Sequence, residues 1–297
     1  MPTISNTLNQ SNTLNHFGVS GGKDSTALML WAVHESGYDP STLRVSFCDT
    51  GNEAEETYDY IDLLSRKIHP IHIISPPLDF YDLAATKGRF PSAKARFCTQ
   101  SLKMRPTKEY LDSLMTDGYT VINHSGVRAS ESADRAKLEE REPGWLSYFG
   151  CETYRPLLHW TLGDVWAVHA RYGIPPNPLY AKGCSRVGCL PCVMSRKSEI
   201  AVIARQFPER IDRIRAEEEA AKLNSRGGWT FFPPAMVPVR FRTGQVHTGK
   251  SGKLVKLTMI DDVVRWAKEG TSAITGTLDF HDLDEPPTCD SSSGLCE

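Results

Sequence analysis

Hydrophobic and polar positions follow two alternating periods along most of the chain, one typical of strands and one typical of helices. Short apolar runs end in turns, and longer stretches follow in which apolar residues recur every three or four positions. The expected strands cover 17–19, 43–48, 71–74 and 119–123, and the expected helices cover 25–35, 54–67, 106–115, 161–172, 208–224 and 260–268. This alternation predicts an α/β fold, an open, mostly parallel sheet with helices on both faces.

The pattern divides the chain into three segments. Residues 1–15 are rich in Ser, Thr and Asn without periodicity, which predicts a disordered leader. The α/β pattern fills residues 16–232, and residues 233–297 form a small C-terminal extension with a flexible tail. No apolar run approaches the roughly 18–20 residues of a membrane span, and the N-terminus does not resemble a secretory signal. We therefore expect a cytoplasmic protein without a membrane segment.

A glycine-rich turn joins the first expected strand to the first expected helix. It reads Ser20-Gly21-Gly22-Lys23-Asp24-Ser25-Thr26. Glycines let the backbone approach an anion closely, and the first amides of the helix point toward it. Lys23 adds a positive charge. The spacing is not that of a Walker-type loop but is similar to the SGGxDS pyrophosphate-binding loop of the PP-loop ATP pyrophosphatases, so we expect a phosphate site rather than a helix start without a ligand.

Asp49-Thr50-Gly51 ends the second expected strand. Ligands of open parallel sheets bind beyond the carboxyl ends of the strands. Asp49 therefore suits either a ribose hydroxyl or Mg²⁺, and an ordinary aspartate turn is the alternative.

The chain has eight cysteines in 297 residues, which favours metal or redox chemistry over a disulfide framework. Cys184, Cys189 and Cys192 have the spacing C-x4-C-x2-C. With a fourth thiolate, for which Cys98 is the best candidate, they suit an iron–sulfur cluster or a tetrahedral zinc, and spacing alone leaves both open. Cys48 and Cys151 are expected to be packing residues.

The formal net charge of −2 excludes a protein that is basic throughout but not a local cationic site. No acidic residue lies between Leu83 and Lys108, where Cys98 is surrounded by cations. These cations are Lys87, Arg89, Lys94, Arg96, Lys103, Arg105 and Lys108. We expect a pocket for anions there rather than a solvated basic face, and nearby cations favour the thiolate form of cysteine. The acid-free stretch from Val237 to Lys256 fits either a nucleic-acid backbone or a solvated β-ribbon.

Taken in order, the motifs of about residues 16–200 resemble the sulfonucleotide reductases, the phosphoadenosine phosphosulfate (PAPS) and adenylyl-sulfate reductases. The motifs are residues 20–25, 49–51, 98–106, 126–135, 155–157, 177–180 and 188–192. The resemblance implies the adenine nucleotide alpha hydrolase-like fold of the PP-loop superfamily. It implies a nucleotide site made by the glycine-rich turn with Asp49, Gly126 and Arg128, and substrate-anion contacts from Arg96, Lys103, Arg105 and Arg135. It also favours a [4Fe-4S] cluster over zinc, held by Cys98, Cys184, Cys189 and Cys192.

Two departures from the reductase pattern bear on function. Cluster-bearing reductases have adjacent cysteines where this chain has Cys98-Thr99, so Cys184 completes the expected set of four. The loop also keeps Lys23, which reductases tend to lack, and this indicates a site for the β- and γ-phosphates of ATP.

The favoured hypothesis is an enzyme of sulfur metabolism that uses ATP and Mg²⁺ to adenylate a substrate, such as a nucleic acid, for thiolation. Lys23 then stabilises the departing pyrophosphate. The alternative is a sulfonucleotide reductase in which Cys296 or Cys289 of the tail forms a thiosulfonate, sulfite is released and a thioredoxin-like protein regenerates the thiol. The second alternative is a non-enzymatic iron–sulfur, nucleotide-binding adaptor of a modification complex. A dispensable tail, in which these two cysteines have no role, is an equally favoured alternative. The sequence does not predict the oligomeric state.

Overall fold

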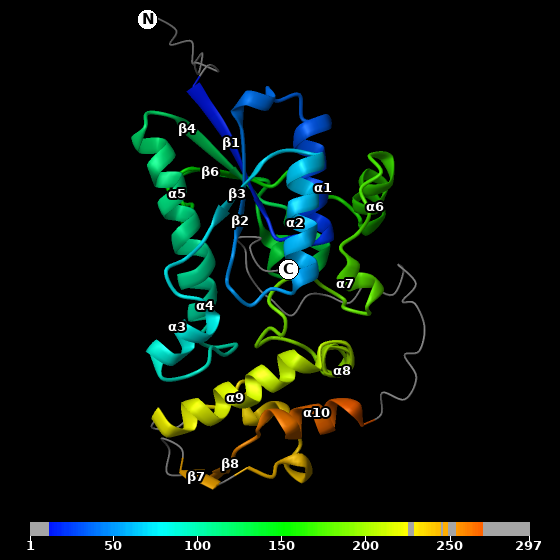
Figure 1. Cartoon of the computed structure of the whole chain (residues 1–297). Helices are drawn as coiled ribbons and strands as arrows, with labels where there is room; N and C mark the ends of the chain where they lie inside the picture. The colour runs from blue at the N-terminus through cyan, green and yellow to red at the C-terminus, as the bar shows by residue number, and fades with distance from the viewer. Residues whose placement is uncertain (1–11, 225–228, 245, 249–253, 270–297) are drawn as a thin grey trace, which may run out of the picture.

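The computed structural model describes residues 12–224, 229–244, 246–248 and 254–269 (Figure 1). Its main sheet has the strand order β3-β2-β1-β4-β6-β5. The strands are β1 (Thr13–Val19), β2 (Leu43–Cys48), β3 (Ile71–Ile74), β4 (Thr120–His124), β5 (Arg141–Glu142) and β6 (Glu152–Tyr154). The pairings are parallel except for β5, which runs antiparallel to β6. The expected open, mostly parallel sheet is confirmed.

The strand order places a topological switch at β1. The chain runs from β1 outward through β2 to β3 and then returns to the other side of β1 to form β4. In sheets of this kind the crevice for a ligand lies beyond the carboxyl ends of the strands at the reversal. The glycine-rich turn follows β1 directly, so it lies at this crevice.

Helices cover both faces of the sheet. Their bounds are α1 (Lys23–His34), α2 (Glu55–Lys67), α3 (Phe80–Lys87), α4 (Phe97–Thr99), α5 (Arg105–Thr116), α6 (Leu162–Arg171), α7 (Pro178–Ala181), α8 (Lys197–Gln206), α9 (Pro208–Asn224) and α10 (Ile260–Lys268). In Figure 1, α1, α2 and α6 lie on one side of the sheet and α5 on the other. Each side has its own apolar cluster, with Phe17 and Leu28 in the first and Leu111 and Val121 in the second.

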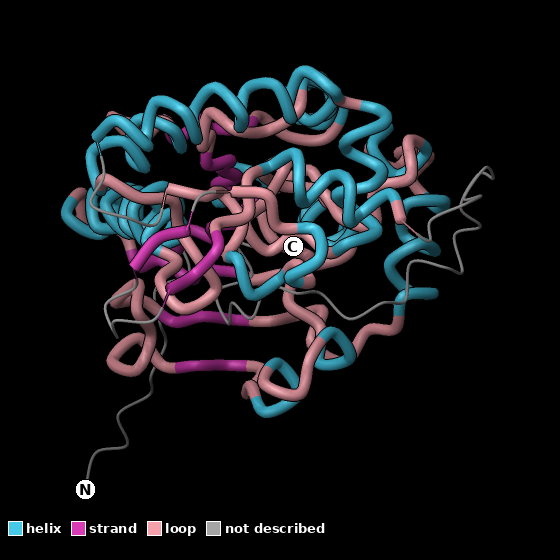
Figure 2. The backbone as a smooth tube through the Cα atoms, turned by 90° about the horizontal axis from the view of Figure 1, so that it is seen from below, coloured by secondary structure: helices cyan, strands magenta, loops and turns pink. Residues whose placement is uncertain are grey.

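A second layer lies beyond the carboxyl ends of the strands, at the bottom of Figure 1. It contains α8, α9, α10 and a hairpin of β7 (Val246–Thr248) and β8 (Leu254–Lys256). Seen from below, helices surround loops that occupy much of the middle of the molecule (Figure 2). The loops that follow the carboxyl ends of the strands therefore lie between the sheet and this helical layer (Figure 1).

One hydrophobic cluster joins the helical layer to the sheet domain. Phe231 is fully buried, and its ring centroid lies 5.8 Å from that of Phe80 and 5.3 Å from that of Phe90. The same cluster contains Val237 and Val263. The described part of the C-terminal extension thus shares a core with the preceding segment across the boundary expected at residue 232.

The expected elements differ from the structure mainly at their ends and where the periodicity is weak. β1 begins at Thr13, inside the segment expected as a leader, because residues 13–15 pair with β4 and Asn15 also pairs with β2. Residues 1–11 lie outside the described part of the chain, as do the tail cysteines Cys289 and Cys296. Helices α3 and α8 were not expected. Within the described residues, no helix is both long and apolar enough to span a bilayer.

Candidate nucleotide site and cysteine pocket

The glycine-rich turn forms a compact cradle between β1 and α1. Gly21 has a φ of +79°, which a residue with a side chain rarely adopts. The backbone amide of Ser20 donates to the Ser25 hydroxyl at 3.1 Å, and the Ser25 hydroxyl donates to the Gly22 carbonyl at 3.1 Å. Gly22 is the N-cap of α1 and adds no side-chain cap, so the helix start is suited to an anion.

A buried carboxylate holds two cations at this turn. The Asp24 carboxylate lies 2.9 Å from the Lys23 ammonium and 2.6 Å from the Arg128 Nε. Burial alone would raise the pKa of Asp24, but Lys23 and Arg128 outweigh burial and keep that pKa below its usual value. Gly126 lies against the same residue, because a Cβ there would be 3.4 Å from the Asp24 carbonyl oxygen. The structure therefore brings Lys23, Asp24, Gly126 and Arg128 together, and their role toward a nucleotide stays a prediction.

Three residues from distant elements hold the turn in place, and sequence reasoning gave none of them this role. The Tyr180 hydroxyl accepts from the Lys23 amide at 3.0 Å, and the Asn177 side chain donates to the Gly21 carbonyl at 3.3 Å. The His169 Nε2 lies 2.8 Å from the Lys23 carbonyl, which it contacts as a donor. These contacts span about 150 residues of sequence, so local patterns carry no signal for them.

A pocket lies at the carboxyl ends of β1 and β2, next to the turn. Its lining residues are Gly18, Val19, Ser20, Ser46, Phe47, Cys48, Glu53, Lys103, Thr107 and Gly188. Cys48, expected to be a packing residue, is buried and has its thiol 3.2 Å from the Thr107 hydroxyl, yet it also lines this pocket. Burial raises the pKa of Cys48. Cys151 packs in the apolar cluster beneath α5.

The Asp49 side chain, in the loop after β2, is hydrogen-bonded to residues nearby in the sequence. The Asp49 carboxylate accepts from the Tyr58 hydroxyl at 2.7 Å and from the Gly51 amide at 2.9 Å. Burial together with the bond to Asp49 raises the pKa of Tyr58. These contacts are those of an aspartate turn, and a role of Asp49 toward ribose or Mg²⁺ stays a prediction.

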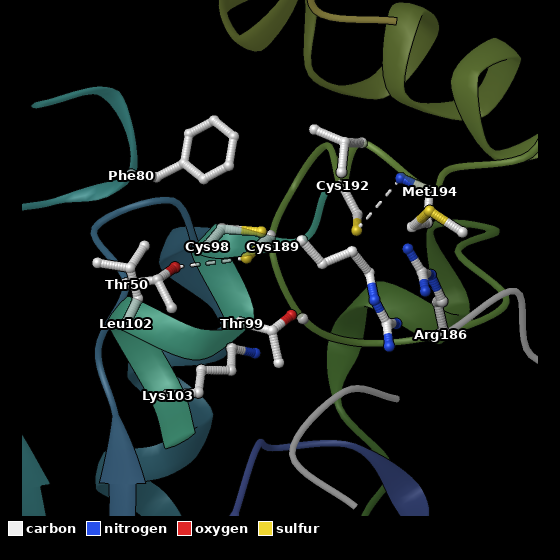
Figure 3. Close-up of a pocket in the computed structure, with 13 residues that line it drawn as sticks. Thr50, Phe80, Cys98, Thr99, Leu102, Lys103, Arg186, Cys189, Cys192 and Met194 are labelled. Carbon is white, nitrogen blue, oxygen red and sulfur yellow. Dashed lines mark hydrogen bonds between the residues drawn. The ribbon is translucent and has the colours of Figure 1, made fainter. Parts of the chain in front are cut away.

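Three of the predicted cysteines line a second pocket. Cys98 comes from α4, and Cys189 and Cys192 come from the loop before α8 (Figure 3). Arg96, Lys103 and Arg186 line the same pocket, so the expected cationic surroundings of Cys98 are present. The Cys192 sulfur accepts from the Met194 amide at 3.4 Å. Lys103 and Gly188 line both pockets, so the cysteine pocket adjoins the pocket beside the glycine-rich turn.

Glu53 is a buried carboxylate that the sequence did not single out. It accepts from the Thr50 amide at 3.0 Å and from the Thr50 hydroxyl at 2.7 Å. The Thr50 hydroxyl in turn lies 3.4 Å from the Cys189 sulfur. Burial raises the pKa of Cys189, Lys103 opposes that shift and the Glu53 charge adds to it. In the sequence, Glu53 resembles an ordinary surface carboxylate. Its burial next to the Cys189 loop is a result of the tertiary structure.

Cys184 does not line the pocket with the other three cysteines. It lies in the hydrophobic core after α7, where its amide donates to the Leu179 carbonyl at 3.0 Å. Burial, followed by the nearby charge of Glu199, raises the pKa of Cys184 to about 12. The expected set of four ligands is therefore brought together only in part, as Cys98, Cys189 and Cys192.

The donor set of this pocket is compatible with a cluster. In the described residues, no three side chains of His, Cys, Asp or Glu are gathered as ligands of a single metal ion. A [4Fe-4S] cluster does not require such convergence, because each thiolate binds a different iron atom. Three cysteine side chains facing a cationic pocket suit that arrangement, with the cations offsetting the charge of thiolates.

Of the four residues predicted to bind substrate anions, two line a pocket and two do not. Arg96 and Lys103 line the cysteine pocket. Arg105 is exposed at the start of α5. Arg135 is fully buried and pairs with Glu131, so it supports the loop after β4 rather than facing either pocket. In the C-terminal basic stretch, Arg240 pairs with Glu269.

The sheet order and the glycine-rich cradle at β1 define an α/β protein with the fold of the PP-loop class, whose cradle is suited to an anion. A sequence profile of the phosphoadenosine phosphosulfate reductase domain matches residues 15–195, more than half of the chain. The chain belongs to this family, whose members include sulfonucleotide reductases. The family resemblance predicted from the motifs is confirmed.

Similar proteins span the chain to different extents. A 37.8 kDa protein of Escherichia phage 186, of uncharacterized function, is 37% identical over 276 residues, which cover 77% of this chain and 81% of the phage protein. An uncharacterized Methanocaldococcus jannaschii protein is 30% identical, covering 71% of this chain and 43% of its own length. The adenosine 5'-phosphosulfate reductase of Allochromatium vinosum is 31% identical, covering 50% of this chain and 58% of the reductase. Apart from the phage protein, these relatives are matched over about half of their length.

Among solved structures, the PAPS reductase of Candida auris aligns with a TM-score of 0.46 and 18% identity. The alignment covers 61% of this chain and 82% of the reductase.

Proposed function

We propose that this protein is an enzyme that adenylates a substrate with ATP and then delivers sulfur to it. The observation that carries the proposal is the adjacency of two pockets. Lys103 and Gly188 line both the pocket beside the glycine-rich turn and the pocket of Cys98, Cys189 and Cys192. An adenylated substrate formed at the first pocket would have its reactive carbon or phosphorus close to the sulfur chemistry of the second.

The glycine-rich turn would bind the phosphates of ATP. The amides at the start of α1 and the Ser20 and Ser25 hydroxyls would donate to phosphate oxygens. Lys23 would stabilise the charge that develops on departing pyrophosphate, with Asp24 and Arg128 fixing its position. The Tyr180 hydroxyl, which accepts from the Lys23 amide, would be displaced or would itself donate to the bound phosphate.

Cys98, Cys189 and Cys192 would hold an iron–sulfur cluster, with Cys184 outside the ligand set. When bound, the cluster would hold sulfide-level sulfur from an external hydrosulfide donor, which would displace AMP from the adenylated substrate without net oxidation or reduction. Arg96 and Lys103 would offset the negative charge of the thiolates and bind an anionic substrate group. Thr50 and Glu53 would fix the position of Cys189 through the contact between the Thr50 hydroxyl and its sulfur.

Reduction of a sulfonucleotide with release of sulfite is the second candidate. It is favoured by the similarity to the Allochromatium vinosum reductase and by the cysteines that line the pocket next to the nucleotide site. The intact loop with Lys23 favours ATP, because an already activated nucleotide has no pyrophosphate to release.

The test compares the two nucleotides with protein purified without oxygen. We expect pyrophosphate release from ATP, with a loss of about a hundredfold in Lys23→Ala because a charge-stabilising group is removed. Lys67→Ala, an exposed lysine at the end of α2, is the matched control and should keep the wild-type rate. If the protein released sulfite from a sulfonucleotide but no pyrophosphate from ATP, the proposed adenylation would be wrong and the reductase function would take its place.

A further inference from the structure

One turn of the chain exposes three large apolar side chains that neither pocket uses. We call residues 143–150, between β5 and β6, the tryptophan turn. Trp145 is 82% exposed, Leu146 60% and Tyr148 42%. Most large hydrophobic side chains of the described residues are buried, so three on one short turn mark a surface for interaction.

The tryptophan turn is held in a defined conformation. The amides of Leu146 and Ser147 donate to the Pro143 carbonyl at 2.9 and 3.1 Å. The Ser147 hydroxyl lies 2.9 Å from the Thr153 hydroxyl of β6, and Phe149 is buried beneath α5. A ring displayed on such a support needs little ordering when a ligand stacks on it.

The tryptophan turn is connected to the wall of the cysteine pocket. The Gln100 side chain donates to the Tyr148 hydroxyl at 2.6 Å. Gln100 is the first residue of η3 (Gln100–Met104), and it follows Cys98 and Thr99, which line the pocket. A molecule bound on the turn would therefore lie beside the segment that presents Cys98.

The side of the turn that faces α5 carries two cations, and the same helix also carries the carboxylates of Glu109 and Asp112. A Cβ at Gly150 would lie 3.6 Å from the Lys108 ammonium, which also pairs with Asp112 at 2.8 Å. Arg105 is exposed and lies three residues before Lys108, so both are on the same face of α5. The segment from residue 84 to residue 107 contains no acid.

More carboxylates lie on the other side of the turn, along β5 and β6. The two glutamates within the strands form ion pairs, Glu142 with Arg155 and Glu152 with Arg141. Glu139 and Glu140 are exposed before β5. A polyanion would therefore follow the side of Gln100 and Arg105, toward the cysteine pocket.

We propose that the tryptophan turn binds single-stranded nucleic acid and presents an unpaired nucleotide to the cysteine pocket. Bases stack on the rings of Trp145 and Tyr148, and the backbone phosphates contact Arg105 and Lys108. An unpaired strand is required, because the bases of a duplex are stacked on one another and do not offer their faces. The inference rests on the proposed function and narrows its acceptor to an unpaired nucleic acid. Exposed rings next to cations favour a nucleic acid over a protein partner, which would instead meet a broad apolar face.

The test measures binding of a short, fluorescently labelled single strand, and of its duplex, to the full chain. We expect the single strand to bind more tightly than the duplex, with an affinity that falls as salt is raised. Trp145→Ala should weaken single-strand binding about tenfold, and Trp145→Phe should restore most of it because a stacking ring remains. Val239→Ala, another exposed apolar side chain, is the matched control and should not change the affinity. Arg105→Gln should reduce the slope of affinity against salt by about one.

Two results would overturn the proposal. The first is equal binding of single strand and duplex that Trp145→Ala does not change. The second is a change of molecular mass in sedimentation caused by Trp145→Ala without any effect on strand binding, which would make the turn a contact between protein chains. The protein could also bind the single strand through Trp145 and yet release no pyrophosphate from ATP. That result would support the nucleic-acid surface and reject the proposed adenylation, so failure of one proposal is distinguishable from failure of the other.

Discussion

Asp24 illustrates how much of the site depends on single side chains. It is fully buried, and two cations from different parts of the chain converge on its two oxygens. A buried carboxylate is costly unless it is paired, and removal of one partner of a buried pair leaves an uncompensated charge. The pairs of Asp24 with Lys23 and Arg128 therefore fix the shape of the glycine-rich turn as well as its charge.

The cysteines show that residues of one type, close together in the sequence, can have different environments. Cys189 lies beside the Thr50 hydroxyl and near Lys103, in the pocket. Cys184 lies among apolar side chains near a carboxylate. Spacing along the chain does not distinguish the two, because the tertiary packing of the loop decides which thiol lines the pocket and which is buried in the core.

We predict that Cys184→Ala keeps most of the iron of the wild type, whereas Cys189→Ala loses most of it. Loss of the Cys184 sulfur leaves a small cavity and costs roughly 1–2 kcal/mol in stability, but it removes no ligand. The measurement is iron and acid-labile sulfide per chain after purification without oxygen, together with the visible absorption. Equal loss in both variants would restore the set of four ligands expected from the sequence.

At the scale of elements, the loop between β2 and α2 is the junction of the site. Asn52 donates through its side chain to the Pro191 carbonyl at 3.1 Å, and its own carbonyl accepts from the Leu190 amide at 2.8 Å. The loop is thereby fixed to the segment that carries Cys189. Its path also passes close to α3, since the Phe80 amide donates to the Thr50 carbonyl at 2.8 Å.

We predict that Gly51→Ala destabilises the protein more than Gly37→Ala does. Both glycines have positive φ, +69° and +75°, so a side chain adds similar backbone strain of about 1–2 kcal/mol at each. A Cβ at Gly51 would lie 2.6 Å from the Asp79 Cβ, whereas nothing lies within 4 Å at Gly37. Overpacking at Gly51 should cost about 1–3 kcal/mol more. The free energy of unfolding in urea measures the difference, and equal losses would show that the loop moves away from Asp79 without cost.

At the scale of the whole molecule, apolar packing joins the helical layer to the sheet domain, and one buried acid ties together segments of the helical layer itself. Glu218 of α9 accepts from the Phe231 amide and from the Ile260 amide at the start of α10, both at 2.8 Å. It thus joins three segments of the chain at a fully buried point. Burial raises the pKa of Glu218 from 4.5 to about 7, although both hydrogen bonds favour the charged form.

We predict that Glu218 makes the stability of the protein depend on pH. Because its folded-state pKa lies above the unfolded value, its contribution is complete below about pH 4.5 and is lost as the pH rises through about 7. The stability of the wild type relative to Glu218→Gln should therefore fall by roughly 1–3 kcal/mol between these values. Urea unfolding at several pH values measures this difference, with Glu219→Gln as the control at an exposed neighbour. Parallel pH profiles for wild type and Glu218→Gln would contradict the prediction.

Local sequence determined the elements whose causes are local. The strands at 43–48 and 71–74, the helices at 208–224 and 260–268, and the glycine-rich turn all lie where periodicity and turn residues predicted them. Helices α3 and α8 were missed because their apolar residues serve a shared core rather than one clear face. The onset of β1 at Thr13 was missed because pairing with β4, rather than a local pattern, makes residues 13–15 a strand.

The sequence by itself determined the chemistry available to this protein, since a phosphate-binding turn, a set of cysteines and an acid-free cationic segment are properties of local composition and spacing. Only the tertiary structure decided which of these groups meet. It joined the two pockets through Lys103 and Gly188, brought Glu53 to the pocket beside the glycine-rich turn and His169 to the turn itself, and left Cys184 in the core. The physical reason is that such contacts depend on how strands order and helices pack across more than a hundred residues, and burial, which sets charge and reactivity, exists only after that packing.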